Sequence, residues 1–253
     1  MHKIFAKPIF LGKKVVFLPE CHSTNDELSQ LARNGDAPEG MVIYSDHQLS
    51  GKGQRGNHWI DQPAKNVLLS LLLRPKFLPI KNQFFLNLII GLAIVDALKE
   101  KLPSRQIKLK WPNDVYVDDR KIAGILIENS LRGTAIESSV NGMGINLNQV
   151  TSLPPNATSL SLELGAEINR QDFIEDLLSY VEVWYRRLKA GSYDEILWEY
   201  HELLYWRNES HIFARQGNNF RGVIKGIDEA GRLVIKTGQG ESSFGLKEVQ
   251  FIE

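Results

Sequence analysis

The spacing of apolar residues over the first 206 residues predicts a mixture of helices and strands. Helical spacing is expected in four segments: residues 24–34, 84–102, 171–189 and 193–204. Thr24 and Asn25 can cap the first helix, and Asn34-Gly35 ends it. The second helix is the most apolar segment of the chain, and Pro103 stops it.

Short apolar or alternating runs predict strands at residues 41–45, 66–73, 107–111, 121–128 and 135–145. The last three runs are separated by turn-forming residues such as Asp118-Asp119 and Arg132-Gly133. We therefore expect consecutive antiparallel strands in an α+β domain, with a mixed or antiparallel sheet packed against helices.

The pattern changes after Trp206. Short β-like runs follow at residues 211–214, 220–227, 232–236 and 243–251, and glycine- and asparagine-rich turns separate them. Short strands at regular spacing predict a small β-barrel of roughly 45 residues. We therefore divide the chain into residues 1–206 and residues 207–253.

Composition adds a limit on partners. Lys+Arg and Asp+Glu both number 30, so net charge gives no case for binding nucleic acid or membranes. The apolar stretch Phe84–Leu98 is interrupted by polar residues, and residues 1–10 hold no apolar run of signal-peptide length. One cysteine, Cys21, excludes an intramolecular disulfide. We expect a soluble, cytoplasmic protein.

Gly51–Gly56 reads Gly-Lys-Gly-Gln-Arg-Gly, which fits the dinucleotide-binding pattern. The segment that follows, Asn57–Pro63, has no helical periodicity, which excludes a Rossmann site, and the phosphate-loop pattern requires lysine where Asn57 stands. The glycines still let the backbone approach an anion closely, and Lys52 and Arg55 supply cationic donors. The loop predicts an anion site that is mobile until ligand binds. A solvated surface turn remains the open alternative.

A second candidate site lies between Lys110 and Gly124. Lys110–Asp114 places a proline and two turn-forming residues directly after a predicted strand. A hairpin explains Pro112 and Asn113 by turn chemistry, but it does not explain why Lys110, Trp111 and Asp114 lie so close together in the sequence. Lys121 then opens an apolar strand, where Ala123-Gly124 would leave room for a ligand beside the backbone. Lys121 is predicted to pair with a ligand carboxylate or phosphate, and the alternative is an ordinary solvated lysine.

Together these segments resemble the biotin–protein ligases, in the order in which that family has them. The matching segments are Ser23-Thr24-Asn25, Gln48 with Gly51–Gly56, Lys-Trp-Pro-Asn-Asp at Lys110–Asp114, Lys-Ile-Ala-Gly-Ile-Leu at Lys121–Leu126, Gly142–Asn146, and residues 207–253 as an SH3-like barrel. The resemblance covers nearly the whole chain. It implies a class II synthetase-like catalytic domain.

The resemblance also implies a two-step reaction. Biotin and MgATP give biotinyl-5′-AMP, and a lysine of a biotin carboxyl carrier protein then attacks the mixed anhydride. Adenylation gives the carboxylate a good leaving group, and bringing two anions together calls for fixed cations and backbone donors. The partner would be the carrier domain of a biotin-dependent carboxylase, and the protein would be a monomer or a homodimer.

Site residues follow from the resemblance, position by position. The implied catalytic residues are Lys121, which contacts the carboxylate and later the phosphate; Asp114, which orients or deprotonates the carrier lysine; and Arg55. The implied biotin-binding residues are Ser23, Thr24, Asn25, Gln48, Lys52, Gly53, Gln54, Lys121 and Gly124. The implied adenylate-binding residues are Gly51, Lys52, Arg55, Gly56, Trp59, Asn66, Asn113 and Asn146, with Trp59 stacked on adenine. Metal ligands are not implied.

Two departures from the family stand out. Gln54 and Asn57 occupy loop positions where the family commonly has arginine, so each removes a cation near the phosphates. Members that also act as repressors carry an N-terminal helix-turn-helix domain, and no basic recognition helix precedes Ser23. We expect a monofunctional ligase.

Other readings stay open. Cys21 beside His22 invites a nucleophile–base interpretation, but adjacent residues rarely face each other usefully. A lipoate–protein ligase or octanoyltransferase of the same superfamily is the nearest enzymatic alternative, although Lys110–Asp114 and the small barrel fit biotin ligases better. A biotin-sensing regulator without catalysis is the alternative of another class.

Overall fold

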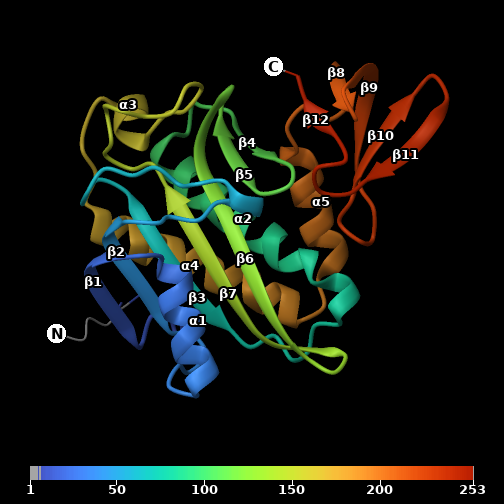
Figure 1. Ribbon diagram of the computed structural model, residues 1–253. Coiled ribbons are helices and arrows are strands. Elements are labelled where there is room, and N and C mark those ends of the chain that lie inside the picture. Colours follow the sequence, from blue (N-terminus) through green and yellow to red (C-terminus); the bar gives the residue numbers. More distant parts are fainter. Residues whose placement is uncertain (1–4, 6, 253) are drawn as a thin grey trace.

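The structure is a computed structural model that describes residue 5 and residues 7–252, with the side chain of Arg55 outside this description. The expectation for residues 1–10 therefore lies partly outside the described residues. Figure 1 shows a large sheet with helices packed against it and a smaller sheet beside it, with α5 near their junction. The α+β class predicted from the sequence is confirmed.

The large sheet has seven strands in the order β1-β2-β3-β7-β6-β5-β4. Their bounds are β1 Val15–Cys21, β2 Val42–Gln48, β3 Val67–Leu73, β4 Ile107–Lys110, β5 Asp114–Val117, β6 Arg120–Arg132 and β7 Ala135–Ile145. β1 pairs in parallel with β2, and every other pair is antiparallel. The sheet is therefore mixed.

Two of these strands were not predicted. β5 is four residues long and lies between β4 and β6, so the expectation that those two strands follow each other directly is wrong. Its short run between Asp114 and the Asp118-Asp119 turn carries too little periodicity to be recognised. β1 is an edge strand whose middle is partly exposed, so its apolar pattern is weak.

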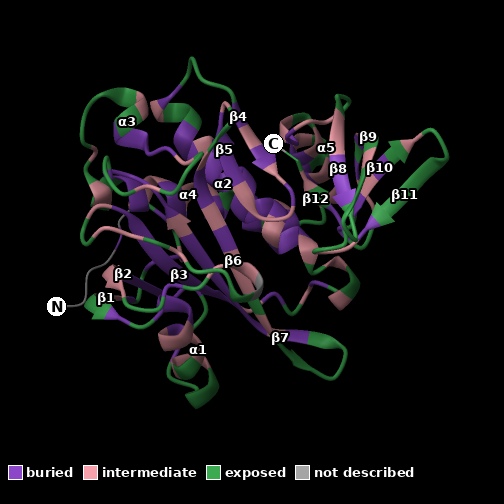
Figure 2. Cartoon of the chain, turned by 45° about the horizontal axis from the view of Figure 1, so that its top comes forward, coloured by how far each residue is buried: buried purple, intermediate pink, exposed green. Residues whose placement is uncertain are grey.

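Helices cover both faces of the large sheet. Their bounds are α1 Thr24–Asn34, α2 Phe84–Lys101, α3 Leu160–Leu164, α4 Arg170–Lys189 and α5 Tyr193–Leu203. Val42 and Tyr44 of β2 face the main core with α2 and α4, whereas Met41 and Ile43 belong to a second cluster under α1. Because both faces are covered, every residue of β3 is buried, as Figure 2 shows for the centre of the sheet.

α2 is the one helix in the described part of the chain that is long and apolar enough to cross a membrane. It is largely buried against the sheet, α4 and α5. A helix that is apolar all round needs such a buried position.

The small sheet has five antiparallel strands in the order β11-β10-β9-β8-β12. Their bounds are β8 Ser210–Arg215, β9 Asn218–Ile227, β10 Leu233–Thr237, β11 Gly240–Phe244 and β12 Gln250–Phe251. The run expected at residues 243–251 is two strands, because a turn intervenes in which the Gly245 amide donates to the Glu248 carboxylate at 2.7 Å. The predicted boundary at residues 206–207 falls between α5 and β8.

Candidate active site

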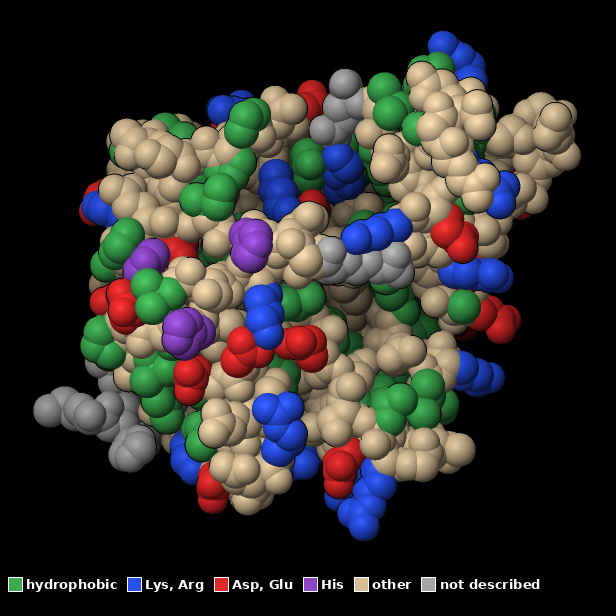
Figure 3. Space-filling view, viewed as in Figure 1, with side chains coloured by type: hydrophobic (Ala, Val, Ile, Leu, Met, Phe, Trp, Pro, Cys, Tyr) green, Lys and Arg blue, Asp and Glu red, His purple; other side chains and the backbone are tan. Residues whose placement is uncertain are grey.

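A cavity of about 720 Å³ opens between the glycine loop, β6 and β7 of the large sheet, and the turn before β12 of the small sheet. Figure 3 shows this hollow with several Lys and Arg side chains around it. Its lining includes twelve of the residues predicted for the site: Ser23, Thr24, Asn25, Gln48, Lys52, Gly53, Gln54, Trp59, Asn113, Asp114, Lys121 and Gly124. Segments far apart in the sequence therefore meet in one place.

Two facing glycines form part of the cavity floor. Gly124 of β6 pairs with Gly144 of β7, and the indole of Trp59 lies over both. A Cβ on Gly144 would lie 2.7 Å from Cε2 of Trp59. The indole Nε1 is buried and has no hydrogen-bond partner among the described residues. Because neither glycine has a side chain, the Trp59 ring can pack directly against the sheet at this point.

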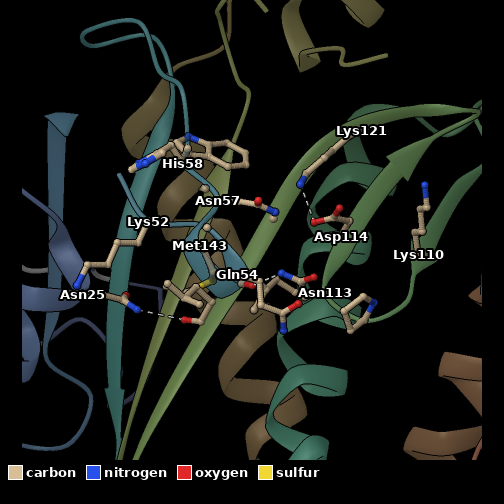
Figure 4. A pocket seen from close by; sticks show the side chains of 18 of the residues that line it. Asn25, Lys52, Gln54, Asn57, His58, Lys110, Asn113, Asp114, Lys121 and Met143 are labelled. Carbon is tan, nitrogen blue, oxygen red and sulfur yellow. Dashed lines mark hydrogen bonds and ion pairs between the residues drawn. The ribbon is translucent and has the colours of Figure 1, made fainter. Parts of the chain in front are cut away.

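Lys121 and Asp114 form the charged centre of the cavity. Their Nζ and Oδ1 atoms lie 2.7 Å apart, with the side chains 34% and 24% exposed (Figure 4). The backbone of Lys121 is fixed on its other side, because its N–H donates to Asn156 O and its carbonyl accepts from the Thr158 N–H. Asp114 opens β5 opposite Gly124. In such a pair the ammonium can balance the charge of an anion, and the carboxylate can orient an incoming amine.

The opposite end of the cavity is neutral and more deeply buried. Ser23 is the N-cap of α1, so the expectation that Thr24 and Asn25 cap this helix is wrong. Thr24 and Asn25 are instead its first residues, each about 3% exposed. The Thr24 N–H donates to Oε1 of Gln48 at 2.8 Å, and Nδ2 of Asn25 donates to the Leu126 carbonyl at 3.2 Å. These contacts hold the start of α1 against the sheet.

The glycine loop is a small hairpin with its own hydrogen bonds. The Gly53 N–H donates to Asn57 O at 2.7 Å, and the Trp59 N–H donates to Gly51 O at 2.9 Å. Gly51 packs behind Trp59, and neither it nor Gly56, at φ +88°, is among the cavity-lining residues.

Lys52 lines the cavity and pairs with Asp26 of α1 at 2.5 Å. The Asp26 hydrogen bond raises the pKa of the Lys52 ammonium, which keeps it charged. The side chain of Arg55 lies outside the described residues.

Besides Gly51 and Gly56, two other predicted adenylate-binding residues do not line the cavity. Asn66 is fully buried, where Nδ2 donates to Gln149 Oε1 at 2.5 Å and Oδ1 accepts from the Leu147 N–H. Asn146 donates from Nδ2 to the Thr158 carbonyl at 3.0 Å. Both amides are used to join loops to the sheet, so the structure does not bring them to the ligand space. Asn113 does line it, with Nδ2 donating to Ile125 O at 2.6 Å.

The small sheet supplies a cavity wall that the sequence did not predict. Leu246, Lys247, Val249, Gln250 and Phe251 line the cavity, although they lie more than a hundred residues after Lys121. Nothing in their local pattern marks them, since only the packing of one sheet beside the other brings them there.

The segment Lys110–Asp114 joins the two sheets. Nζ of Lys110 lies 4.7 Å from the ring centroid of Tyr116 and 5.1 Å from that of Phe251. Nε1 of Trp111 donates to Gly231 O, in the turn before β10, at 2.9 Å. The crowding of polar and aromatic residues in this segment is explained by this junction as well as by the cavity.

The lining offers little for a resident metal ion. Asp114 is the carboxylate among the lining residues, and the described residues contain no group of three or more His, Cys, Asp or Glu side chains suited to hold a metal. Cys21 is buried, and burial raises the pKa of its thiol, which makes it a poor nucleophile.

Comparisons with known proteins agree with this geometry. Residues 18–146 match the Biotin/lipoate A/B protein ligase family, and residues 211–250 match the Biotin protein ligase C terminal domain. The chain is 33% identical over 238 residues to the bifunctional ligase/repressor BirA of Bacillus subtilis, covering 91% of this chain and 71% of that one. It is 30% identical over 244 residues to the biotin–[acetyl-CoA-carboxylase] ligase of Paracoccus denitrificans, covering 92% and 99%.

The fold agrees with a solved structure as well. The biotin protein ligase from Aquifex aeolicus in complex with biotin and ATP superposes with a TM-score of 0.80 at 26% identity, covering 95% of this chain and 99% of that one. The likeness therefore extends over both sheets.

Proposed function

The chain belongs to the Biotin/lipoate A/B protein ligase family, and we propose that its cavity performs both steps of biotin–protein ligation. In the first step a biotin carboxylate oxygen attacks the α-phosphorus of ATP, and pyrophosphate leaves. In the second step a lysine amine of a carrier protein attacks the acyl carbon of biotinyl-5′-AMP. An amide bond forms, AMP leaves, and the amine loses a proton.

The single observation that carries this proposal is the Lys121–Asp114 pair beside the glycine floor. The ammonium of Lys121 can balance the carboxylate and α-phosphate as they approach, which a neutral cavity would not do. The Asp114 carboxylate, 2.7 Å from that ammonium, can orient the carrier lysine and accept its proton. Activation and transfer would therefore use the two halves of one ion pair.

Magnesium enters this proposal as part of the MgATP substrate. A small hard cation is commonly held by phosphates with one or two protein carboxylates. Asp114 is the carboxylate that the lining offers, so the phosphates would supply most of the metal's ligands. Trp59, whose indole lies over Gly124 and Gly144, would stack on the adenine.

The carrier we propose is the biotin carboxyl carrier of a biotin-dependent carboxylase, because relatives are named biotin–[acetyl-CoA-carboxylase] ligases. We place the reaction in the cytoplasm, because a chain with one cysteine cannot form an intramolecular disulfide. We propose that the chain divides into a catalytic unit (1–206) and a small C-terminal unit (207–253). The catalytic unit would carry out both steps of the reaction, and the C-terminal unit would supply one wall of the cavity.

The test is pyrophosphate release on mixing the protein with MgATP and one acid at a time. Biotin should support release, and lipoate and octanoate should not. A carrier domain with one acceptor lysine should then gain the mass of one biotinyl group, and its lysine-to-arginine variant should gain none. Release with lipoate or octanoate but not with biotin would overturn the assignment. If none of the three acids supported release, a biotin-sensing regulator without catalysis would be favoured.

A further inference from the structure

Asp61 is a buried carboxylate in an otherwise solvated part of the chain. It lies in the return limb, residues 59–66, which leads from the glycine loop to β3. Its side chain is 1% exposed, whereas its neighbour Ile60 is 57% exposed. A carboxylate is rarely buried unless it is paired, because removing its charge from water is costly. Its partners are therefore the reason for its position.

Those partners lie at the end of β2. Oδ1 of Asp61 lies 2.7 Å from Nδ1 of His47, and Oδ2 accepts from the Gln48 N–H at 3.3 Å. An ionised carboxylate only accepts, so Nδ1 of His47 carries the proton in this pair. The backbone of His47 is itself fixed, because its N–H donates to the Ser45 hydroxyl at 3.2 Å and its carbonyl accepts from that hydroxyl at 2.8 Å. Asp61 therefore joins the return limb to a fixed point of the large sheet.

This attachment lies two residues after Trp59. Two residues span at most about 7 Å of chain, so Trp59 stays close to β2 as long as Asp61 is bonded there. On its other side the Trp59 N–H donates to Gly51 O at 2.9 Å. The return limb is next bonded to β2 at Ala64, whose N–H donates to Asp46 O. Ala64 comes five residues after Trp59, and five residues allow about 17 Å of free chain. Asp61, rather than Ala64, therefore limits where Trp59 can lie.

The Trp59 ring needs such a limit, because its own contacts do not fix it. The indole packs on Gly124 and Gly144, and its Nε1 has no hydrogen-bond partner among the described residues. Apolar contact of this kind is not directional. The place of the ring over the two glycines must therefore come from its backbone.

We propose that Asp61 is a positioning residue that, through its bond to His47, holds Trp59 over the glycine floor before the nucleotide binds. This inference rests on the proposed function, in which Trp59 stacks on the adenine. A side chain that is already in place need not be ordered when the ligand binds, so ordering it costs no affinity. A freed return limb would instead make ATP binding carry that cost. The biotin end has its own bonds from Thr24 to Gln48 and should depend on Asp61 far less.

The first test measures dissociation constants for MgATP and for biotin, each alone, by titration calorimetry. Asp61→Ala should weaken ATP binding by about tenfold, because a charge-assisted hydrogen bond is lost, and biotin binding by about threefold or less. Asp61→Asn keeps a carbonyl for the Gln48 N–H and an NH₂ group that the other tautomer of His47 can accept, so it should restore most of the ATP affinity. Glu167→Ala is the control, since it removes an exposed carboxylate that pairs with Lys65 of the same limb at 2.6 Å. It should leave both constants unchanged.

The second test is limited digestion of the unliganded protein with trypsin, followed by mass spectrometry. Trypsin cuts after Lys52 and Arg55 of the glycine loop only when that loop leaves the sheet. In Asp61→Ala, cleavage at these two positions should be about fivefold faster than in the wild type. Cleavage outside the loop should keep the wild-type rate, which a general loss of stability would not allow.

Equal weakening of ATP and biotin, with faster cleavage throughout the chain, would overturn the proposal, because Asp61 would then serve only the fold. Unchanged ATP affinity in Asp61→Ala would overturn it as well. If Asp61→Ala fails to fold, His47→Ala breaks the same pair while letting water reach the carboxylate, and it should give the same selective loss; retained ATP affinity there would refute the role. Pyrophosphate release by the wild type reports on the proposed function, whereas the tryptic rate needs no substrate, so the two failures remain distinguishable.

Discussion

At its inner end the cavity is built from Thr24, Asn25 and Gln48, which take part in hydrogen bonds between neutral groups. Thr24 and Asn25 are buried, and Gln48 is half-buried. At its outer end Lys121 pairs with Asp114, and Lys52 pairs with Asp26, with side chains between 24% and 47% exposed. The difference follows from what each end has to do. Neutral groups can be buried and fixed at little cost once they are bonded, whereas fully buried charges would be costly. In the proposed function, the inner end would select the ligand, and adenylation and transfer to the carrier would take place at the outer end.

The largest expected effect comes from removing the cation at the outer end. Lys121→Ala should lower biotin-dependent pyrophosphate release by about a hundredfold to a thousandfold, because its ammonium, which lies beside Asp114 and Gly124, would balance the charge of the two reacting anions. Biotin binding at the inner end should change far less. Lys225→Ala on the small sheet is the control. Normal pyrophosphate release by the Lys121 variant would show that the charged end is dispensable.

The carboxylate of the same pair should act mainly in the second step. We expect Asp114→Asn to slow single-turnover transfer from preformed biotinyl-AMP to the carrier by about ten- to a hundredfold, since a charge-assisted contact to the amine is lost. Asp118→Asn, in the turn just after β5, serves as the control. Transfer at the wild-type rate would contradict the role of Asp114, whatever happens to the first step.

The floor between the two ends can be tested at Gly144. Gly144→Ala should raise the KM for ATP by about tenfold, because the new Cβ would lie 2.7 Å from the Trp59 indole and would displace it. Gly238→Ala, where a Cβ meets nothing within 4 Å, should leave KM unchanged. An unchanged KM for ATP in Gly144→Ala would argue that Trp59 does not serve the nucleotide.

The smallest effect is expected for the Lys52–Asp26 pair, which is the more exposed of the two ion pairs at the outer end of the cavity. Asp26→Asn should change the KM for either substrate by about twofold or less, because exposed ion pairs contribute about 0–1 kcal/mol. The effect should shrink further as salt is raised. Glu27→Gln in the same turn of α1 is the control. A large, salt-independent loss of activity would show that the Asp26–Lys52 pair is part of the rigid inner end.

Much of the fold could be predicted because it depends on local chemistry. The first helix ends at Gly35 in a left-handed conformation that favours glycine, and the apolar run that begins at Phe84 forms a buried helix. The glycine loop and Lys110–Gly124 were predicted as the two parts of one site, and both line the cavity. Strand β5 could not be found, because four residues give no detectable period.

Most helices and strands, the motifs and the family could be predicted from the sequence, because capping, periodicity and residue type act over a few positions. Which side chains lie together in space depends instead on the packing of distant segments. Asn66 and Asn146 join loops to the sheet, Leu246–Phe251 form a wall of the cavity, and Ser70 is bonded to Thr24 across 46 positions of sequence. The physical reason is that hydrogen bonds and steric fit act over a few ångströms in space. Only sheet pairing and packing fix those distances between residues remote along the chain.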